Sequence, residues 1–185
     1  MKCPFIIGEK VYLRPLEPSD LNEAYLSWVN DAEVTKYMET GTFPTSLPQL
    51  QKYYNDAQDN SNMVHLAIMR TVTEAVGLTH EEHIGNISLN QINWVNRIAC
   101  LGIMIGNKRY WGKGYGADTC KILIKYAFDR LNMHKVWLGV YEEHSHAVKS
   151  YLVAGFKVEA VLKKEIYRDG EYHNKVIMSV FSEKG

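Results

Sequence analysis

The sequence predicts an α/β fold that forms a single domain over residues 1–185. Segments with the period of strands alternate with segments of helical period, and no repeat or linker interrupts them. One apolar, strand-like segment leads through a glycine-rich turn into a long amphipathic stretch, between residues 99 and 130. With 185 residues, 46% of them hydrophobic, the chain is long enough to bury one substantial core.

Helix-capping residues and apolar runs define the elements expected in the first half of the chain. Ser19 is expected to cap a helix that continues to Trp28, and Ser46 to cap another that ends near Ala57. A further helical stretch is expected over residues 33–38. The segments with strand character are residues 11–16, 64–69, 84–89 and 99–105, and the turn-rich stretches expected to close hairpins are residues 71–82 and 90–97.

The second half of the chain continues the alternation of helix and strand. The pair Asp169-Gly170 is typical of a hairpin turn between the last two strands. The expected elements are a helix over residues 116–130, a strand over 136–140, a helix over 145–153, and strands over 156–162 and 173–181.

The glycine-rich turn at residues 109–116 reads Arg-Tyr-Trp-Gly-Lys-Gly-Tyr-Gly. Its glycines let the backbone turn tightly and let anionic oxygens approach the amides, while the first N–H groups of the next helix point the same way. Lys113 adds a positive charge. The pattern lacks the Gly-Lys-Ser/Thr ending of nucleotide hydrolases and the wider last gap of the dinucleotide fingerprint. Taken alone, it fits a phosphate cradle or a plain tight turn.

A second block, residues 144–156, ends in Tyr-x-x-x-Gly-Phe, and the two blocks together resemble the GNAT superfamily of N-acetyltransferases. Residues 101–116 look like its acetyl-CoA motif, and residues 140–156 look like its second cofactor motif. The segments similar to the branch of ribosomal-protein N-terminal, spermidine and nucleotide-sugar N-acetyltransferases are residues 13–16, 28–31 and 167–172. The resemblance implies a mixed, mostly antiparallel sheet of about seven strands, with helices on both faces and a splayed strand pair that binds the cofactor.

The resemblance also implies roles for individual residues. Tyr151 matches the general acid of the superfamily, and a phenol with an ordinary pKa of about 10 is a competent proton donor to an alkyl thiolate. The alternative for Tyr151 is an aromatic side chain packed at a helix end. Backbone groups of the strand before the turn are expected to pair with the pantetheine arm, and the amides of the turn to bind the pyrophosphate. The residues expected to hold acetyl-CoA are Ile103, Met104, Ile105, Trp111, Gly112, Lys113, Gly114, Tyr115, Gly116, Ala117 and His144.

Three positions depart from the pattern of the family. Trp111 stands where many members carry Gln or Arg, in a place where backbone contacts dominate. His144 stands where an Asn usually bonds the cofactor and caps the helix, and a neutral imidazole offers one donor and one acceptor for that role. Cys100 stands where this branch often has Glu, so the strand lacks a carboxylate base. His146 lies near His144, but no third ligand is spaced to complete a metal site, so no metal is expected.

The acceptor site is expected to be walled by the first helices and the following loop. The candidates for this wall are Trp28, Tyr37, Met38 and Phe43, with Tyr167 and Tyr172 from the final hairpin. Aromatic residues like these are more often part of a core than of a pocket. Glu82 and His83 fit either a base that acts through water or exposed loop residues. Because the carboxylates of this region are spread along the chain, a small amine, an amino sugar or a peptide N-terminus is favoured over a polyamine.

The sequence therefore predicts acetyl transfer from acetyl-CoA to a primary amine by direct attack on the thioester. The alternatives are a non-catalytic acyl-CoA sensor and an unrelated phosphate-binding protein. Lys plus Arg equals Asp plus Glu at 21 each, which offers no net positive field for nucleic acid. No apolar run reaches membrane-spanning length, the first eight residues are too short for a signal peptide, and the three cysteines suit a reduced chain. A cytoplasmic monomer or homodimer without a membrane partner is expected.

Overall fold

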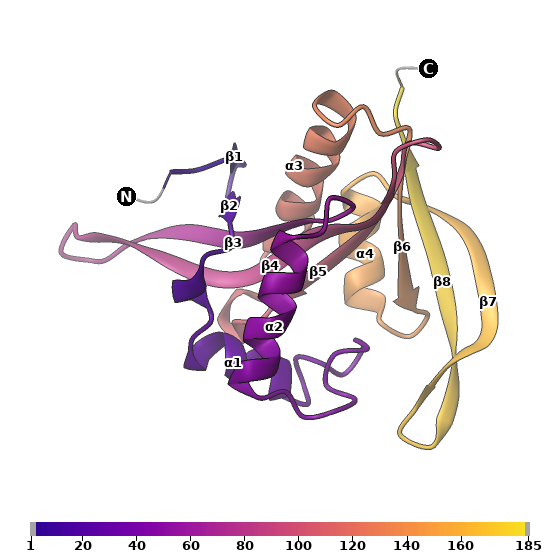
Figure 1. Cartoon of the computed structure of the whole chain (residues 1–185), viewed down its shortest axis with the longest axis horizontal. Coiled ribbons are helices and arrows are strands. Elements are labelled where there is room, and N and C mark those ends of the chain that lie inside the picture. The colour runs from indigo at the N-terminus through magenta and orange to yellow at the C-terminus, as the bar shows by residue number, and fades with distance from the viewer. Residues whose placement is uncertain (1–2, 184–185) are drawn as a thin grey trace.

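The computed structural model describes residues 3–183, which form one twisted sheet with helices on both faces (Figure 1). The predicted domain of residues 1–185 includes four terminal residues that lie outside this range. The elements, in chain order, are β1 (Ile6–Ile7), β2 (Tyr12–Pro15), α1 (Glu23–Asn30), α2 (Leu47–Gln58), β3 (Val64–Thr73), β4 (Thr79–Asn93), β5 (Ile98–Ile105), α3 (Tyr115–Asp129), β6 (Lys135–Tyr141), α4 (Ser145–Val153), β7 (Lys157–Arg168) and β8 (Glu171–Phe181). Short 3-10 helices lie at Pro18–Asp20 and Lys108–Tyr110.

The sheet is mixed and mostly antiparallel, which confirms the predicted fold class. Its strand order is β1-β2-β3-β4-β5-β6-β8-β7, and of these neighbours only β5 and β6 run parallel. The described chain contributes eight strands to it, one more than the seven or so expected. The extra strand, β1, pairs with β2 at two positions only, too short a run to leave a periodic signal in the sequence.

The parallel strands β5 and β6 separate after a short contact. Their register pairs Ile98 with Lys135, Ala99 with Val136 and Cys100 with Trp137, and no later pair forms among the described residues. Beyond Cys100, β5 continues beside β4 alone, while β6 continues beside β8. The edge of β5 that faces β6 therefore keeps backbone N–H and C=O groups without a strand partner, which confirms the predicted splayed pair.

Each face of the sheet buries its own apolar cluster. On one face, α3 packs Cys120, Leu123, Ile124 and Ala127 against the strands, at the spacing of an amphipathic helix. On the other face, α1 and α2 pack against a second cluster that includes Met104 of β5. Figure 1 shows α1 and α2 in front of the sheet and α3 and α4 behind it. The sheet is thus the layer between the two clusters, and β5 contributes side chains to both of them.

The first predicted helix begins three residues later than expected, because Asn22 and not Ser19 is its cap. The Asn22 side chain accepts hydrogen bonds from the amides of Ala24 and Tyr25. Ser19 lies in the 3-10 turn before it, where the buried Asp20 carboxylate is paired with Arg14. The predicted cap at Ser46 is confirmed.

The predicted helix over residues 33–38 is wrong, because this segment forms a series of turns. The Asp31 side chain caps the amides of Glu33 and Val34, and the Thr35 hydroxyl donates to the Asp31 carbonyl. Such local side-chain bonds compete with a continuous helix. The chain then runs as a loop to α2, and this loop becomes one wall of the site described below.

The predicted hairpins are present, but their strands extend further than expected. β3 and β4 continue through most of residues 71–82, and the reversal is confined to residues 74–78. The turn between β7 and β8 is confirmed at Asp169 and Gly170, whose φ angles are 51° and 92°. Positive φ at both positions is the signature of the tight hairpin turn that an Asp-Gly pair favours.

Candidate active site

The glycine-rich turn adopts a backbone that requires glycine and leaves open space above it. Gly112 and Gly114 have φ angles of 68° and 83°, and a Cβ added to Gly112 would meet no heavy atom within 4 Å. Gly114 is also the N-cap of α3, so the first amides of that helix face the same space without intrahelical partners. An anion that reaches this turn can approach backbone N–H groups and the positive end of the helix dipole together.

Four hydrogen bonds of side chains connect this turn, and the segment that leads into it, to neighbouring parts of the chain. The indole Nε1 of Trp111 donates to the carbonyl oxygen of Ile105 at 2.7 Å. The Lys10 ammonium donates to the Lys113 carbonyl at 2.9 Å. The Glu82 carboxylate accepts hydrogen bonds from Asn107 and from the Tyr110 hydroxyl. Glu82, a candidate base in the sequence, is therefore engaged with the segment that leads into the turn.

Tyr151 lies on α4, close enough to Cys120 of α3 and Cys100 of β5 to interact with both thiols. Its half-buried ring packs edge-on against Phe156 at 5.8 Å between centroids. Burial is the main cause that raises the pKa of the Tyr151 phenol above its ordinary value, and the nearby Cys120 and Cys100 thiols add to the effect. A phenol in this environment stays protonated at neutral pH, while its raised pKa makes it a weaker acid than a free phenol.

His144 is placed at the N-cap of α4, but its side chain makes no capping hydrogen bond. The imidazole instead stacks on Tyr37, with 4.3 Å between ring centroids and an interplanar angle of 23°. Burial first, and the nearby His146 and Lys36 second, lower the His144 pKa. Within residues 3–183, no three His, Cys, Asp or Glu side chains are grouped so that they could hold a metal ion.

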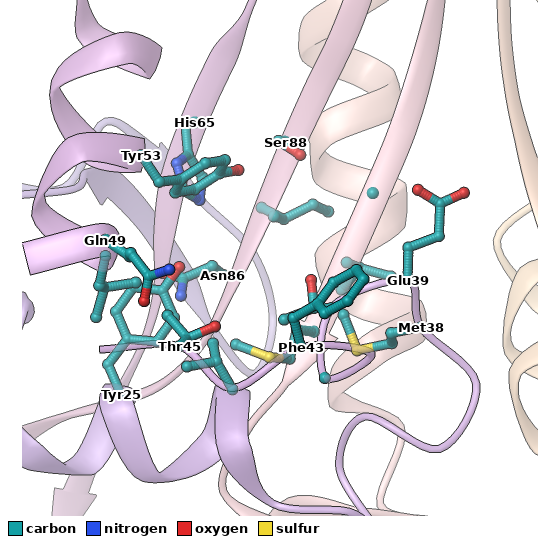
Figure 2. A pocket seen from close by; sticks show the side chains of 18 of the residues that line it. Tyr25, Met38, Glu39, Phe43, Thr45, Gln49, Tyr53, His65, Asn86 and Ser88 are labelled. Atoms are coloured by element: carbon teal, nitrogen blue, oxygen red, sulfur yellow. The ribbon is translucent and has the colours of Figure 1, made fainter. Parts of the chain in front are cut away.

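A cavity of about 430 Å³ lies on the α1 and α2 side of the sheet. Figure 2 shows its lining: Glu39, Met38 and Phe43 of the loop after α1 lie on one side, and Gln49, Tyr53, His65 and Asn86 lie on the other. Its floor includes Gly102, Ile103 and Met104 of β5. The cavity therefore meets β5 at the segment whose other edge is free of β6.

The register of β3, β4 and β5 brings the polar residues of the cavity floor together. His65 of β3 lies opposite Ser88 of β4, and Ser88 lies opposite Gly102 of β5. Asn86 lies two residues before Ser88 and so shares its face of the sheet. A Cβ on Gly102 would come within 3.2 Å of the Ser88 hydroxyl, so the missing side chain keeps this floor open.

The candidate acceptor residues of the sequence are divided between cavity and core. Met38 lines the cavity. Trp28 is 9% exposed and packs against the backbone of Gly106, where an added Cβ would lie 2.1 Å from the indole. Tyr37 stacks on His144 outside the lining. His83 is not part of the lining, but it contacts the lining residue Asn86, because its Nε2 lies 3.0 Å from Oδ1 of Asn86.

Sequence reasoning missed the residues of the polar floor, His65, Asn86 and Ser88. The signal was present, because Asn86, Ser88 and Asn90 are polar residues that alternate with the apolar Ile87 and Leu89. A period of two places such residues on one face of the sheet, and buried polar groups on an apolar face indicate a site.

In the part of the chain that the structure describes, no helix is long and apolar enough to span a membrane.

Comparison with known proteins finds relatives along nearly the whole chain. The family model described as an acetyltransferase (GNAT) domain matches residues 10–157. A spermidine N(1)-acetyltransferase of Escherichia coli is 32% identical over 174 residues, which cover 94% of this chain and 87% of that relative. A crystal structure of spermidine N-acetyltransferase from Vibrio cholerae in complex with CoA and spermine has a TM-score of 0.79 at 27% identity, and covers 95% of this chain and 97% of that one. A dodecameric structure of the Vibrio cholerae enzyme in an intermediate state has a TM-score of 0.73 at 26% identity, with 95% of each chain covered.

Proposed function

Because the chain belongs to the GNAT acetyltransferase family and uses acetyl-CoA as its donor, we propose that it acetylates a primary amine held in the cavity above β5. One observation carries this proposal. The segment from Gly102 to Met104 forms part of the cavity floor, and the same segment has an edge that no neighbouring strand covers. A donor on that edge and an acceptor in the cavity would meet across a single strand.

The donor half of the site is assigned to backbone groups. The free edge at Ile103, Met104 and Ile105 offers N–H and C=O groups that can pair with the amide arm of the donor as another strand would. The amides from Trp111 to Ala117 surround the open space at the start of α3 and suit the pyrophosphate. His144 is half-buried at the start of α4, on the other side of the gap, and we keep it as a donor contact through its ring nitrogens.

The chemistry needs a neutral amine, a stabilised oxyanion and a proton for the leaving thiolate. The amine nitrogen attacks the thioester carbonyl, a C–N bond forms, and the C–S bond breaks with its electron pair on sulfur. Tyr151 donates its proton to that sulfur. The proton lost by the amine then restores the Tyr151 phenol through solvent, so the net reaction releases the thiol and the amide.

No strong base is assigned to the amine. The Glu82 carboxylate is engaged with Asn107 and Tyr110. Burial raises the pKa of the Cys100 thiol to about 11, so at neutral pH this side chain carries no negative charge. The chain therefore draws on the fraction of acceptor that is already neutral in solution. This favours amines of modest basicity, such as amino sugars and peptide N-termini.

A polyamine is the second candidate acceptor, because the names of several relatives specify spermidine. A non-catalytic acyl-CoA sensor is the alternative to both. Turnover of a panel of amines, followed by release of CoA, separates these functions. Acetylation of any primary amine supports the enzyme, whereas tight binding of acetyl-CoA with no turnover on any amine would favour the sensor. No thermal stabilisation by acetyl-CoA would contradict the assignment of the donor site.

A further inference from the structure

Two buried polar atoms of the cavity lack a hydrogen-bond partner among the described residues. They are Nδ1 of His65 and Nδ2 of Asn86, and both residues line the cavity. Asn86 itself is only 4% exposed. Buried polar groups are nearly always paired in folded proteins, so two such atoms in one cavity indicate that a bound molecule completes them.

The partners of these two residues fix their orientation. Oδ1 of Asn86 lies 3.0 Å from Nε2 of His83, so Nδ2 is the amide atom that is left without a partner. The His65 ring packs edge-on against Tyr53, with 5.4 Å between centroids. Ser88, opposite His65 in the sheet, accepts from Nδ2 of Asn90 at 2.9 Å, so its hydroxyl hydrogen is left to donate elsewhere. These neighbours hold the polar floor in place before any acceptor binds.

This floor carries no charge at neutral pH. Asn86 and Ser88 are neutral by nature, and burial lowers the pKa of the His65 imidazole to about 4. Glu39 is the one acid among the described residues that line the cavity, and Figure 2 shows it on the side away from His65. The cavity thus offers one place for a positive charge and a separate neutral, hydrogen-bonding surface.

We propose that the acceptor is a singly charged amine that bears hydroxyl groups, an amino sugar, and that His65, Asn86 and Ser88 recognise its hydroxyls. This inference rests on the proposed acetyltransferase function and narrows its substrate. A hydroxyl donates and accepts at once, so it pairs with His65 in either tautomer and with the Asn86 amide in either orientation. A volume of about 430 Å³ lies in the range of pockets for small ligands.

A polyamine fits the same floor poorly. Its methylene segments offer no hydrogen-bonding group to His65 or Asn86. Its further ammonium groups would be buried next to neutral groups, because Glu39 is the one acid among the described residues that line the cavity. Burial of an unpaired charge is among the most costly events in a protein interior.

The direct test compares acceptors on the wild-type protein. We expect 2-, 3- or 4-amino hexoses to show kcat/KM at least about tenfold above cyclohexylamine, which keeps the ring and the amine but lacks hydroxyls, since each added hydrogen bond contributes a few-fold. Spermidine and a short peptide are the other acceptors in the comparison. If spermidine or the peptide is the best acceptor, or if cyclohexylamine equals the amino hexoses, the inference is overturned while the acetyltransferase function stands. If no amine is acetylated at all, both are overturned.

Two variants test the floor itself. His65→Phe keeps an aromatic ring against Tyr53 and removes Nδ1, and Asn86→Leu keeps the volume and removes the amide. Each should raise KM for the amino hexose about tenfold more than KM for cyclohexylamine, because only the hydroxyls form hydrogen bonds with the floor. His80→Phe, on the exposed far end of β4, is the matched control. Equal losses on both acceptors, with acetyl-CoA affinity retained, would overturn the role of the floor in recognition.

Discussion

Gly114 and Gly77 have nearly the same positive φ angle, 83° and 82°, in two unrelated places. Gly114 caps α3 beside the open space of the glycine-rich turn, whereas Gly77 lies in the turn between β3 and β4. A side chain at either position is strained to a similar degree because of its positive φ. The same substitution at both positions therefore separates the cost of backbone strain from an effect on the donor site.

We expect Gly114→Glu to abolish the thermal stabilisation by acetyl-CoA, because its carboxylate would enter the space assigned to the pyrophosphate. Gly77→Glu should lose similar intrinsic stability and keep the full response. At ligand concentrations a hundredfold above the dissociation constant, that response corresponds to about 2.7 kcal/mol. Thermal unfolding with and without acetyl-CoA measures both. Retained stabilisation in Gly114→Glu would place the pyrophosphate elsewhere.

The hydrogen bond from Trp111 to the Ile105 carbonyl couples the end of β5 to the glycine-rich turn. We expect Trp111→Phe to weaken acetyl-CoA binding about three- to tenfold with little change in kcat, since one neutral hydrogen bond contributes about 1 kcal/mol. Isothermal titration measures the affinity. The control is Trp94→Phe, which removes an equivalent indole hydrogen bond to Asn62 far from the turn. Equal affinity losses in the two variants would indicate a general packing effect.

The glycine-rich turn could be predicted from the sequence, whereas the acceptor cavity could not. Positive φ is an intrinsic preference of glycine, so a local pattern such as residues 112–116 already specifies the turn. The helix over 145–153 was likewise predicted to the residue, because its apolar spacing is local. The cavity depends on the register of β3, β4 and β5, which brings His65 and Ser88 together from 23 positions apart (88 − 65). Periodicity within one segment carries no information about that pairing.

Contacts between distant parts of the chain decide which capping residue begins α1 and where the Trp28 side chain packs. Ser19 and Asn22 are both good capping residues, and the choice between them follows from the buried pair of Arg14 and Asp20, which fixes the chain just before α1. Trp28, which is expected in the acceptor wall, fills the space that Gly106 leaves beside its indole. Such packing decisions depend on partners from distant parts of the chain.

Tyr151 is expected to act in the chemical step. We expect Tyr151→Phe to lower kcat about a hundredfold or more and to leave acetyl-CoA affinity nearly unchanged, because the change removes the proton donor and keeps the ring against Phe156. The control is Tyr126→Phe, another tyrosine whose pKa is raised by burial, on α3 against Phe5. Steady-state turnover measures kcat, and titration with acetyl-CoA measures the affinity. A fully active Tyr151→Phe enzyme would mean that water protonates the thiolate.

The His65 imidazole makes stability depend on pH. Burial lowers its pKa from 6.5 to about 4, so below pH 6.5 the unfolded chain binds the proton first and stability falls until about pH 4. At about 1.4 kcal/mol per pKa unit, the loss due to this group amounts to about 3 kcal/mol. We expect urea unfolding of His65→Phe to lose correspondingly less stability between pH 6.5 and 4 than wild type. His80→Phe should follow wild type, and an unchanged slope in His65→Phe would show that His65 is not the group responsible.

The missing strand carboxylate at Cys100 leads to a prediction about acceptor titration. Since burial keeps the Cys100 thiol protonated up to about pH 11, no group on the strand accepts the amine proton, and kcat/KM should rise with pH until the acceptor amine itself is neutral. Cys100→Ser should keep this profile. Cys100→Glu should extend activity to lower pH and help the most basic amines most, because a carboxylate two residues before Gly102, on the same face of β5, can take up their proton. Cys3→Ser, at an exposed position, is the control for loss of a thiol. A flat wild-type profile near neutral pH, with spermidine as the best acceptor, would mean that another base serves the amine and that Cys100 does not determine the choice of substrate.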